Sequence, residues 1–307
     1  MHDISVVVPV YNDPDGIQDT LESIQKTTYP PENYEVIVID NQSTDHTKKV
    51  IEEFSNKYEN IRLFSENTFQ SSYAARNKGV SKSSGEIVAF IDSDMLVPDT
   101  WLSDIYNYFY ENRADYVGCN VQIFLPDNYN SIVGRYNKSV RFPVALYIKN
   151  MNFAPTSCLV VRRSVIEEVG LFDQRLTSGG DIEFGHRVAE SGYIQKFAKE
   201  ISVYHPARVS LRENIKKSVR LGKGREQRYR CCGSTKNSRP WYDPRNVLPP
   251  NPRLFYNRAS DSCNIKYLTI FYLLDYFFKI SKFLGQIKYR LENESAYTKI
   301  VERLAVR

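Results

Sequence analysis

Cysteine is sparse in this chain of 307 residues, which has five cysteines, an odd number, and no CxxC spacing. Only Cys231 and Cys232 stand side by side. Disulfide frameworks and structural zinc sites need even sets or characteristic spacings of cysteine, so the sequence argues against both. The cysteine pattern fits a reducing compartment.

A glycine-rich phosphate-binding loop is also missing. The first apolar run, residues 4–10, is followed by the letters YNDPDG. A dinucleotide-binding dehydrogenase would carry GxGxxG at that point, and a sugar nucleotidyltransferase would carry a glycine-rich loop followed by Arg and Lys. The sequence therefore disfavours both enzyme classes.

Long apolar runs without charge are absent as well. The N-terminus passes straight into a Val-rich run without the features of a secretory signal, so we expect a cytoplasmic protein. Residues 265–288 are rich in Leu, Ile, Phe and Tyr, but Asp275, Lys279 and Lys282 interrupt them, which argues against a membrane-spanning helix. The pattern predicts an amphipathic helical tail over 263–307. It either makes a peripheral contact with a membrane surface or packs on the protein or a second subunit.

What the sequence does contain is the pattern of an α/β domain. The chain is 42% hydrophobic and long enough for one such domain with an appendage. Short apolar runs alternate with amphipathic stretches over the first hundred residues, which predicts βαβ units and a mostly parallel sheet. The expected strands cover 4–10, 34–40, 61–64 and 86–92, and the expected helices 15–27, 44–58 and 71–82.

Basic residues are concentrated in one stretch. The formal net charge is only +5, yet residues 207–230 hold nine Lys and Arg against two Glu. Such a stretch suits a diphosphate, a lipid phosphate or acidic lipid headgroups, although it also fits a solvated face. No recognisable nucleic-acid-binding module accompanies it, so we expect no nucleic-acid partner. Residues 238–253 contain five prolines and predict a connecting loop.

Two carboxylates flank a serine directly after a predicted buried strand, in Asp92-Ser93-Asp94. Alternate residues of an extended chain point to the same side, and carboxylate oxygens are ligands that Mg²⁺ and Mn²⁺ prefer. Such a cation would offset the charge of a nucleotide diphosphate as it leaves. Taken alone the pair is weak evidence, because acidic turns often follow strands.

Five ordered sequence blocks are more specific, and together they resemble the signatures of family 2 glycosyltransferases. The resemblance covers about residues 4–205. It implies an α/β fold of the GT-A type, with a Rossmann-like, mostly parallel sheet flanked by helices, to which the amphipathic helical tail predicted from the residue pattern adds a C-terminal extension. The blocks are PVYN at 9–12, VIDNQSTD at 38–45, AARNKG at 74–79, AFIDSD at 89–94 and EEVGLFDQRLTSGGDIEFGHR at 167–187.

The resemblance implies a metal-dependent, inverting transfer of a sugar from a nucleotide diphosphate donor, with a UDP- or GDP-sugar favoured. Tyr11 would pack on the base, Asp40 would bind base or ribose, and Arg76 would frame the base and the diphosphate. Asp94 and His205 would hold Mn²⁺ or Mg²⁺. The implied donor site comprises Pro9, Tyr11, Asn12, Asp40, Arg76, Asp92 and Ser93.

Each implied role has a plainer alternative. Tyr11 fits a packed aromatic residue, Asp40 a turn residue that caps the next helix, Arg76 a solvated helix charge and His205 a structural histidine. Asp45 is interpreted as a structural acid at a helix start.

Asp181 aligns with the general base of the family. That base takes the proton of the acceptor hydroxyl as the new bond forms. The usual letters there are Gly-Glu-Asp, whereas this chain has Gly179-Gly180-Asp181, a departure that puts the acceptor contacts in question. Gly180 and Glu183 are the candidate acceptor residues, and Arg187, one turn later, is spaced to pair with Glu183.

The predicted organisation is a nucleotide-sugar-binding half at 1–115, an acceptor-binding half at 116–206, a basic and Pro-rich segment closing over the site at 207–262, and the tail at 263–307. Arg220, Lys223 and Arg225 would belong to the closing segment. The acceptor is a polysaccharide, a glycolipid or a lipid-linked glycan. The rival interpretation is a non-catalytic binding or scaffold subunit with the same fold.

Overall fold

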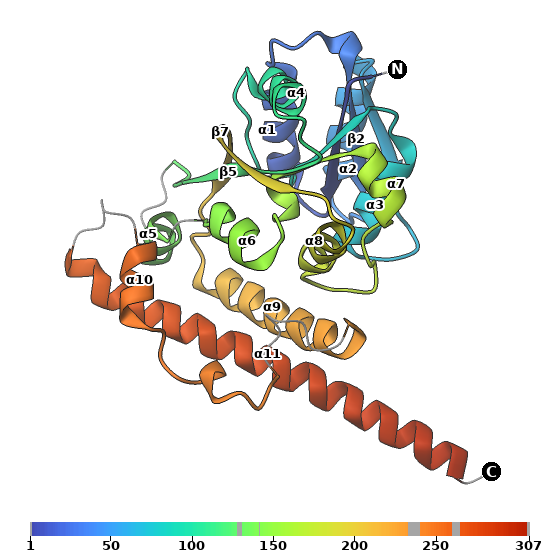
Figure 1. Cartoon of the computed structure of the whole chain (residues 1–307). Coiled ribbons are helices and arrows are strands. Elements are labelled where there is room, and N and C mark those ends of the chain that lie inside the picture. The colour runs from blue at the N-terminus through green and yellow to red at the C-terminus, as the bar shows by residue number, and fades with distance from the viewer. Residues whose placement is uncertain (1, 128–130, 141, 233–239, 260–264, 306–307) are drawn as a thin grey trace. The chain divides into compact units, whose positions relative to one another are not determined.

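The computed structural model describes residues 2–127, 131–140, 142–232, 240–259 and 265–305 (Figure 1). The chain divides into two compact units. Unit 1 comprises Met1–Phe124, Phe142–Arg175 and Gly180–Pro206, and unit 2 comprises Leu125–Arg141, Leu176–Gly179 and Ala207–Arg307.

Unit 1 is built on a seven-stranded sheet with the strand order β3-β2-β1-β4-β6-β5-β7. The pairing is parallel except at β6, which runs antiparallel to both of its neighbours. The predicted α/β class with a mostly parallel sheet is therefore confirmed. The strands are β1 (Ile4–Val10), β2 (Tyr34–Asp40), β3 (Ile61–Ser65), β4 (Ile87–Phe90), β5 (Tyr116–Phe124), β6 (Leu159–Arg162) and β7 (Gln195–Pro206).

The first half of unit 1 consists of βαβ units. All seven residues of β1 and of β2 are buried, which explains why both strands are continuously apolar. The chain steps from β1 through β2 to β3 at one edge of the sheet and then returns to β4 on the other side of β1. Because such crossovers are right-handed, α1 and α2 lie on one face of the sheet and α3 lies on the other. The helices are α1 (Pro14–Gln25), α2 (Thr47–Lys57) and α3 (Ser72–Lys82), with a 3₁₀ turn at Pro31–Asn33.

The second half of unit 1 completes the sheet. Strands β5 and β7 pair along most of their length, with an irregularity between Cys119 and Asn120. Phe172 packs edge-on against Phe90 of β4 and also contacts Phe184 of α8. The remaining helices are α4 (Trp101–Glu111), α6 (Val144–Met151), α7 (Arg163–Val169) and α8 (Gly180–Glu190), with a 3₁₀ turn at Thr156–Cys158.

Unit 2 is helical. The basic stretch after position 206, which belongs to the segment predicted at 207–262, forms the 22-residue helix α9 (Leu211–Cys232). Helix α11 (Ile265–Ala305) runs beside it and covers most of the helical tail predicted at 263–307 (Figure 1). Helix α5 (Ile132–Ser139), a 3₁₀ turn (Pro244–Asn246) and α10 (Pro252–Arg258) complete the unit. Its buried apolar cluster comprises Val133, Tyr136, Phe255, Phe271 and Phe278.

Helices α9 and α11 approach closely because glycine stands at their contact. A Cβ at Gly222 would lie 1.8 Å from the carbonyl oxygen of Lys282, and a Cβ at Gly285 would lie 2.2 Å from that of Val219. One side of the tail helix therefore packs on the protein itself. Within the described residues, no helix is long and apolar enough to cross a membrane.

We expect Gly222→Ala to destabilise unit 2 by about 1–3 kcal/mol, because the added methyl group has no space beside the Lys282 carbonyl. Helix propensity alone would make the alanine variant more stable by about 1 kcal/mol. A lower free energy of unfolding would therefore show that the close helix contact decides the outcome. Urea unfolding followed by circular dichroism measures it. Lys216→Ala, an exposed position on α9, serves as the control and should change stability by less than about 0.5 kcal/mol.

Candidate active site

Polar residues gather at the carboxyl edge of the unit 1 sheet. In the strand register Val10 pairs with Asp40, and Asp40 pairs with Ser65. Tyr11 follows β1, and Asp92 follows β4, which is parallel to β1 and ends at the same edge. Strand β7 runs in the same direction as β4 and ends there as well. Ligands of open parallel sheets bind at this position, where the strand order changes direction.

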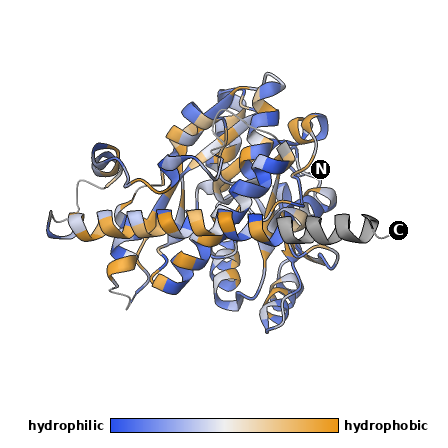
Figure 2. Cartoon of the chain, turned by 90° about the horizontal axis from the view of Figure 1, so that it is seen from below, coloured by the Kyte–Doolittle hydropathy of each residue, from blue (hydrophilic) through white to orange (hydrophobic). Residues whose placement is uncertain are grey.

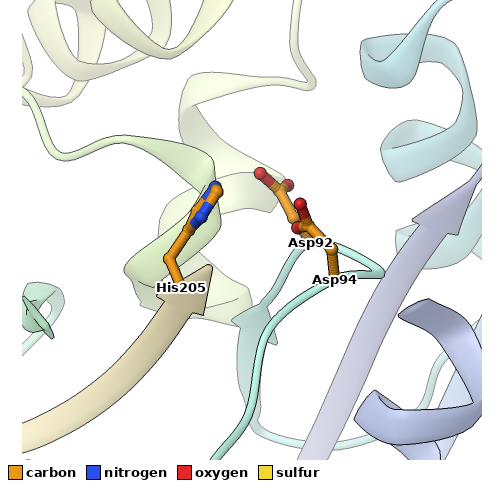
Figure 3. A group of neighbouring side chains, drawn as sticks. All are labelled: Asp92, Asp94 and His205. Atoms are coloured by element: carbon orange, nitrogen blue, oxygen red, sulfur yellow. The ribbon is translucent and has the colours of Figure 1, made fainter. Parts of the chain in front are cut away.

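Asp92, Asp94 and His205 form one cluster at the edge. Each residue offers one ligand atom, and these atoms lie within 4.8 Å of one another. The two aspartates are half-buried and the histidine is buried. Figure 3 shows both carboxylates on the side of the imidazole ring, with the histidine at the tip of its strand. The structure thus brings together the two predicted metal ligands, and it adds Asp92.

Backbone pairing explains how residues so distant in sequence meet. Leu96 and Tyr204 exchange two backbone hydrogen bonds of 2.9 and 2.8 Å, forming an antiparallel bridge. This bridge holds the segment after Asp94 against β7, one residue before His205. On the other side the buried hydroxyl of Thr20 lies 2.8 and 2.7 Å from the carbonyl oxygens of Ser93 and Met95. The loop that carries Asp94 is therefore attached to both β7 and α1.

The tautomer of His205 suits metal binding. Its Nδ1 lies 2.7 Å from the carbonyl oxygen of Pro206. A carbonyl oxygen only accepts hydrogen bonds, so Nδ1 carries the hydrogen and donates it. In the neutral ring the lone pair is then on Nε2, which is the arrangement found in metal-bound histidines whose other nitrogen is hydrogen-bonded.

Arg76 is buried beneath this cluster. Its side chain is 5% exposed, and a guanidinium nitrogen lies 2.5 Å from Oδ1 of Asp92. A buried guanidinium needs such a partner, because a charge left uncompensated in the interior is costly. Arg76 therefore orients Asp92, and its guanidinium is not a solvated helix charge.

Asp13, which the sequence analysis did not single out, lies beside the cluster. Ser93 donates a hydrogen bond of 3.0 Å to its carboxylate. Burial raises the pKa of Asp13, and the nearby negative charge of Asp94 raises the pKa further against the effect of the Ser93 hydrogen bond. The carboxylates of Asp13 and Asp94 thus repel one another, which favours a cation nearby. The side chain of Asp13 also caps α1 through the Gly16 amide.

The predicted donor residues at β1 and β2 differ in exposure. Tyr11 is 47% exposed, so its ring is accessible at the edge. Asn12 has φ +49° and accepts a 2.8 Å hydrogen bond from the Thr44 amide. Asp40 is 5% exposed and accepts a 3.2 Å bond from the Ser43 amide. Pro9 is buried inside β1. Pro9, Asn12 and Asp40 therefore shape the backbone around the exposed Tyr11.

Glu66, one residue beyond β3, is a second residue that the sequence analysis missed. It is buried, and its carboxylate accepts hydrogen bonds of 2.7 and 3.1 Å from the amides of Thr68 and Phe69. Burial alone would raise the pKa of Glu66, but these amides outweigh it and hold the pKa below its usual value. Glu66 thereby shapes the loop that leads into α3.

Asp181 lies in the first turn of α8. The hydroxyl of Tyr73 lies 3.4 Å from its Oδ1 and donates to it. Burial, followed by the negative charge of Asp181, raises the pKa of Tyr73, so the hydroxyl stays protonated and remains a donor. Tyr73 is three residues before Arg76 on α3. One helix thus contacts both Asp92 and Asp181.

Tyr73 also accounts for the glycine that replaces the usual glutamate. A Cβ at Gly180 would lie 2.9 Å from the Tyr73 ring, so the ring occupies the space that a side chain at 180 would need. Glu183 is paired bidentately with Arg187, at 2.5 and 2.9 Å. Arg187 also donates to carbonyl oxygens at the end of α7. The carboxylate of Glu183 is therefore occupied by an internal pair.

Three other polar residues, Asp45, His186 and His2, lie outside the cluster. Asp45 accepts a 2.9 Å bond from the Thr47 amide and acts at the start of α2, as expected for a helix-start acid. His186 lies 3.0 Å from the Met151 carbonyl, and His2 lies 3.0 Å from Ser84. The two histidines have local structural partners.

Comparison with known proteins identifies the family. The sequence model described as "Glycosyl transferase family 2" matches residues 5–170, more than half of the chain. The chain belongs to this glycosyltransferase family. It is 39% identical over 224 residues to glycosyltransferase AglE of Haloferax volcanii, covering 73% of each chain. It is 38% identical over 114 residues to a poly(ribitol-phosphate) beta-glucosyltransferase of Bacillus spizizenii, covering 36% of this chain and 18% of that one.

Solved structures agree on the fold of this family 2 chain. The mannosyltransferase PcManGT of Pyrobaculum calidifontis superposes with a TM-score of 0.66 at 18% identity, covering 94% of this chain and 87% of that one. Staphylococcus aureus TarS, residues 1–349, gives 0.56 at 17% identity, covering 95% and 92%. The predicted GT-A fold and the prediction of a transferase are thus confirmed.

We expect Gly180→Glu, which restores the usual family residue, to destabilise the protein by about 1–3 kcal/mol because it displaces the Tyr73 ring. The cost should largely disappear when Gly180→Glu is introduced into a Tyr73→Ala protein, since the two positions are in direct contact. Urea unfolding of the unmodified protein, the two single variants and the double variant gives the coupling energy between positions 73 and 180. Equal costs in both backgrounds would show that Tyr73 does not restrict position 180.

Proposed function

We propose that this protein is a metal-dependent, inverting glycosyltransferase. It moves a sugar from a nucleotide diphosphate donor, UDP- or GDP-linked, to a hydroxyl or lipid-phosphate acceptor in polysaccharide, glycolipid or lipid-linked glycan synthesis on the cytoplasmic side. The observation that carries the proposal is the Asp92, Asp94 and His205 cluster, which a single helix, α3, connects to Asp181.

The cluster fits a divalent cation of the Mn²⁺ or Mg²⁺ type. The two carboxylates supply oxygen ligands of the kind that suit Mn²⁺ and Mg²⁺, and Nε2 of the imidazole adds a nitrogen ligand. Asp94 and His205 would hold the ion, with Asp92 beside it. When bound, the ion supplies positive charge that offsets the charge on the departing diphosphate. PcManGT was solved with GDP-Man and Mn²⁺, which supports this assignment.

The donor would lie along the carboxyl edge of β1, β2 and β4. Tyr11 offers an accessible ring for the base, and Asp40 an acceptor for base or ribose hydrogen bonds. Ser93 lies between the two carboxylates and is held by Asp13. Arg76 positions Asp92 from below. TarS was solved with UDP-GlcNAc, so nucleotide sugars of two classes bind to structural neighbours of this chain.

Asp181 is the proposed general base for a hydroxyl acceptor. Its carboxylate takes the acceptor proton while the acceptor oxygen forms a bond to the anomeric carbon. The bond from that carbon to the phosphate oxygen breaks on the opposite face, and its electron pair leaves with the diphosphate, which inverts the anomeric centre. Tyr73 is a positioning residue, since its hydrogen bond orients the Asp181 carboxylate.

The alternative is a non-catalytic scaffold subunit with the same fold. The retained Asp92, Asp94 and Asp181 argue against loss of turnover, because a scaffold would have no use for a cation site and a base together. Transfer measured with purified protein discriminates between the two.

We expect UDP- or GDP-sugars to raise the melting temperature of the protein only when Mn²⁺ or Mg²⁺ is present. A thermal-shift screen of UDP-, GDP-, CMP- and dTDP-sugars, with and without metal, tests this. Asp94→Ala should abolish the metal-dependent shift, whereas Asp19→Ala, an exposed acid on α1, should retain it. A full donor shift in Asp94→Ala would contradict the assigned metal site.

We expect Asp181→Asn to lower transfer by about 10²–10⁴-fold, the usual contribution of a general base, while leaving the donor-induced thermal shift intact. Glu190→Gln, at the far end of the same helix, is the matched control and should keep full activity. If Asp181→Asn instead lost donor binding with the fold preserved, Asp181 would belong to the donor site. NMR of the glycoside product checks the inversion.

A further inference from the structure

Helix α11 carries an apolar face that its packing against unit 2 leaves uncovered. One side of the helix buries Phe271 and Phe278 in the core of the unit. The other side exposes a row of large apolar residues, called here the α11 apolar face. It comprises Ile270, Leu273, Phe277, Leu284 and Leu291, which are 45%, 59%, 45%, 55% and 62% exposed.

The spacing makes this face continuous. Four of its members recur every seven residues, at 270, 277, 284 and 291, so they lie nearly above one another after each two turns. The row extends roughly 32 Å along the helix. Figure 2 shows orange residues recurring along the side of α11 that faces the viewer. A continuous exposed apolar face of this size marks an interaction surface.

A loop beside α11 exposes a further apolar residue of unit 2. Lys279 donates a 2.7 Å hydrogen bond to the carbonyl oxygen of Leu248, and Tyr276 donates a 2.9 Å bond to that of Val247. The side chain of Leu248 is itself 53% exposed. The prolines that follow limit the conformations of this loop. Unit 2 thus exposes Leu248 in addition to the apolar row of α11.

The positive charge of unit 2 favours a negatively charged partner for the α11 apolar face. Its segments contain 25 Lys and Arg against 9 Asp and Glu, a net charge of +16, whereas unit 1 has 16 against 27, a net charge of −11. A second copy docked through the same face would bring two strongly positive units together. An anionic lipid surface complements both the charge and the apolar row.

Lysines flank the apolar face as such a surface requires. Lys266 lies one turn before Ile270, and Lys288 lies one turn after Leu284, both exposed. On an anionic bilayer their long side chains would reach lipid phosphates while the apolar residues between them enter the acyl boundary. We propose that the α11 apolar face docks unit 2 on the surface of an anionic lipid bilayer, with α11 lying in the plane of the interface.

This proposal does not depend on sugar transfer. It concerns unit 2, whereas the metal cluster and Asp181 belong to unit 1. Donor-induced thermal shifts of the same variants therefore separate a failure of lipid docking from a failure of the proposed activity.

Flotation of the full chain with vesicles tests the docking. We expect binding to vesicles of phosphatidylcholine and phosphatidylglycerol, at least about tenfold weaker binding to phosphatidylcholine alone, and weakening when salt rises from about 0.1 to about 0.5 M. The double variant Leu273→Gln/Leu284→Gln should lower binding by at least about tenfold. Glutamine is a good helix former, so α11 should persist, as circular dichroism verifies.

The matched control is Leu146→Gln/Ile194→Gln, which removes two exposed apolar residues of unit 1 and should leave vesicle binding unchanged. Absence of binding to anionic vesicles at low salt would overturn the proposal. So would an equal loss in the control variant. A concentration-dependent dimer, seen by analytical ultracentrifugation and abolished by Leu273→Gln/Leu284→Gln while vesicle binding persists, would assign the face to a second copy instead.

Discussion

The buried ion pair between Arg76 and Asp92 is the contact on which the candidate site depends. Arg76 is 4% exposed, so its charge is compensated only if Asp92 stays in place. Asp92 in turn lies within ligand distance of Asp94 and His205. The orientation of one carboxylate is thus determined from beneath by a fixed positive charge, which holds the cluster ready before any ligand arrives.

Helix α3 extends this arrangement to the reaction centre. Tyr73 and Arg76 are one turn apart, so the same helix orients both Asp181 and Asp92. The helix is itself fixed closely against the sheet, because a Cβ at Gly79 would lie 2.4 Å from Val7. A base on α8 and a carboxylate after β4 therefore share one rigid support. Catalysis by positioned groups requires this kind of fixed geometry.

The two units divide the physical properties of the chain. Unit 1 is acidic and gathers carboxylates at one sheet edge, where the proposed cation would offset them. Unit 2 is basic and helical, and one side of α11 packs on α9 and the apolar cluster while another side stays apolar and exposed. The net charge of the whole chain is only +5 because the opposite charges of the two units largely cancel. Donor chemistry and lipid docking thereby rest on different surfaces with opposite charge.

Local sequence alone determined much of unit 1. The apolar runs at 4–10 and 34–40 became fully buried strands, and the positions after them became the polar edge, because continuous Val and Ile runs are stable only inside a sheet covered on both faces. Asp92 and Asp94 were identified from their position directly after a predicted buried strand, whereas Asp181 was identified through the resemblance to the family 2 signatures. The predicted strand at 86–92 is shorter in the structure, β4 ending at Phe90.

Tertiary structure decided the remainder. The meeting of Asp94 with His205 requires the Leu96–Tyr204 bridge, and the glycine at 180 makes sense only beside Tyr73, 107 positions earlier in the chain. Packing against α9 and the apolar cluster of unit 2 buries one side of α11, while another side stays exposed. No local pattern contains these outcomes, because each depends on which distant residue occupies the neighbouring space.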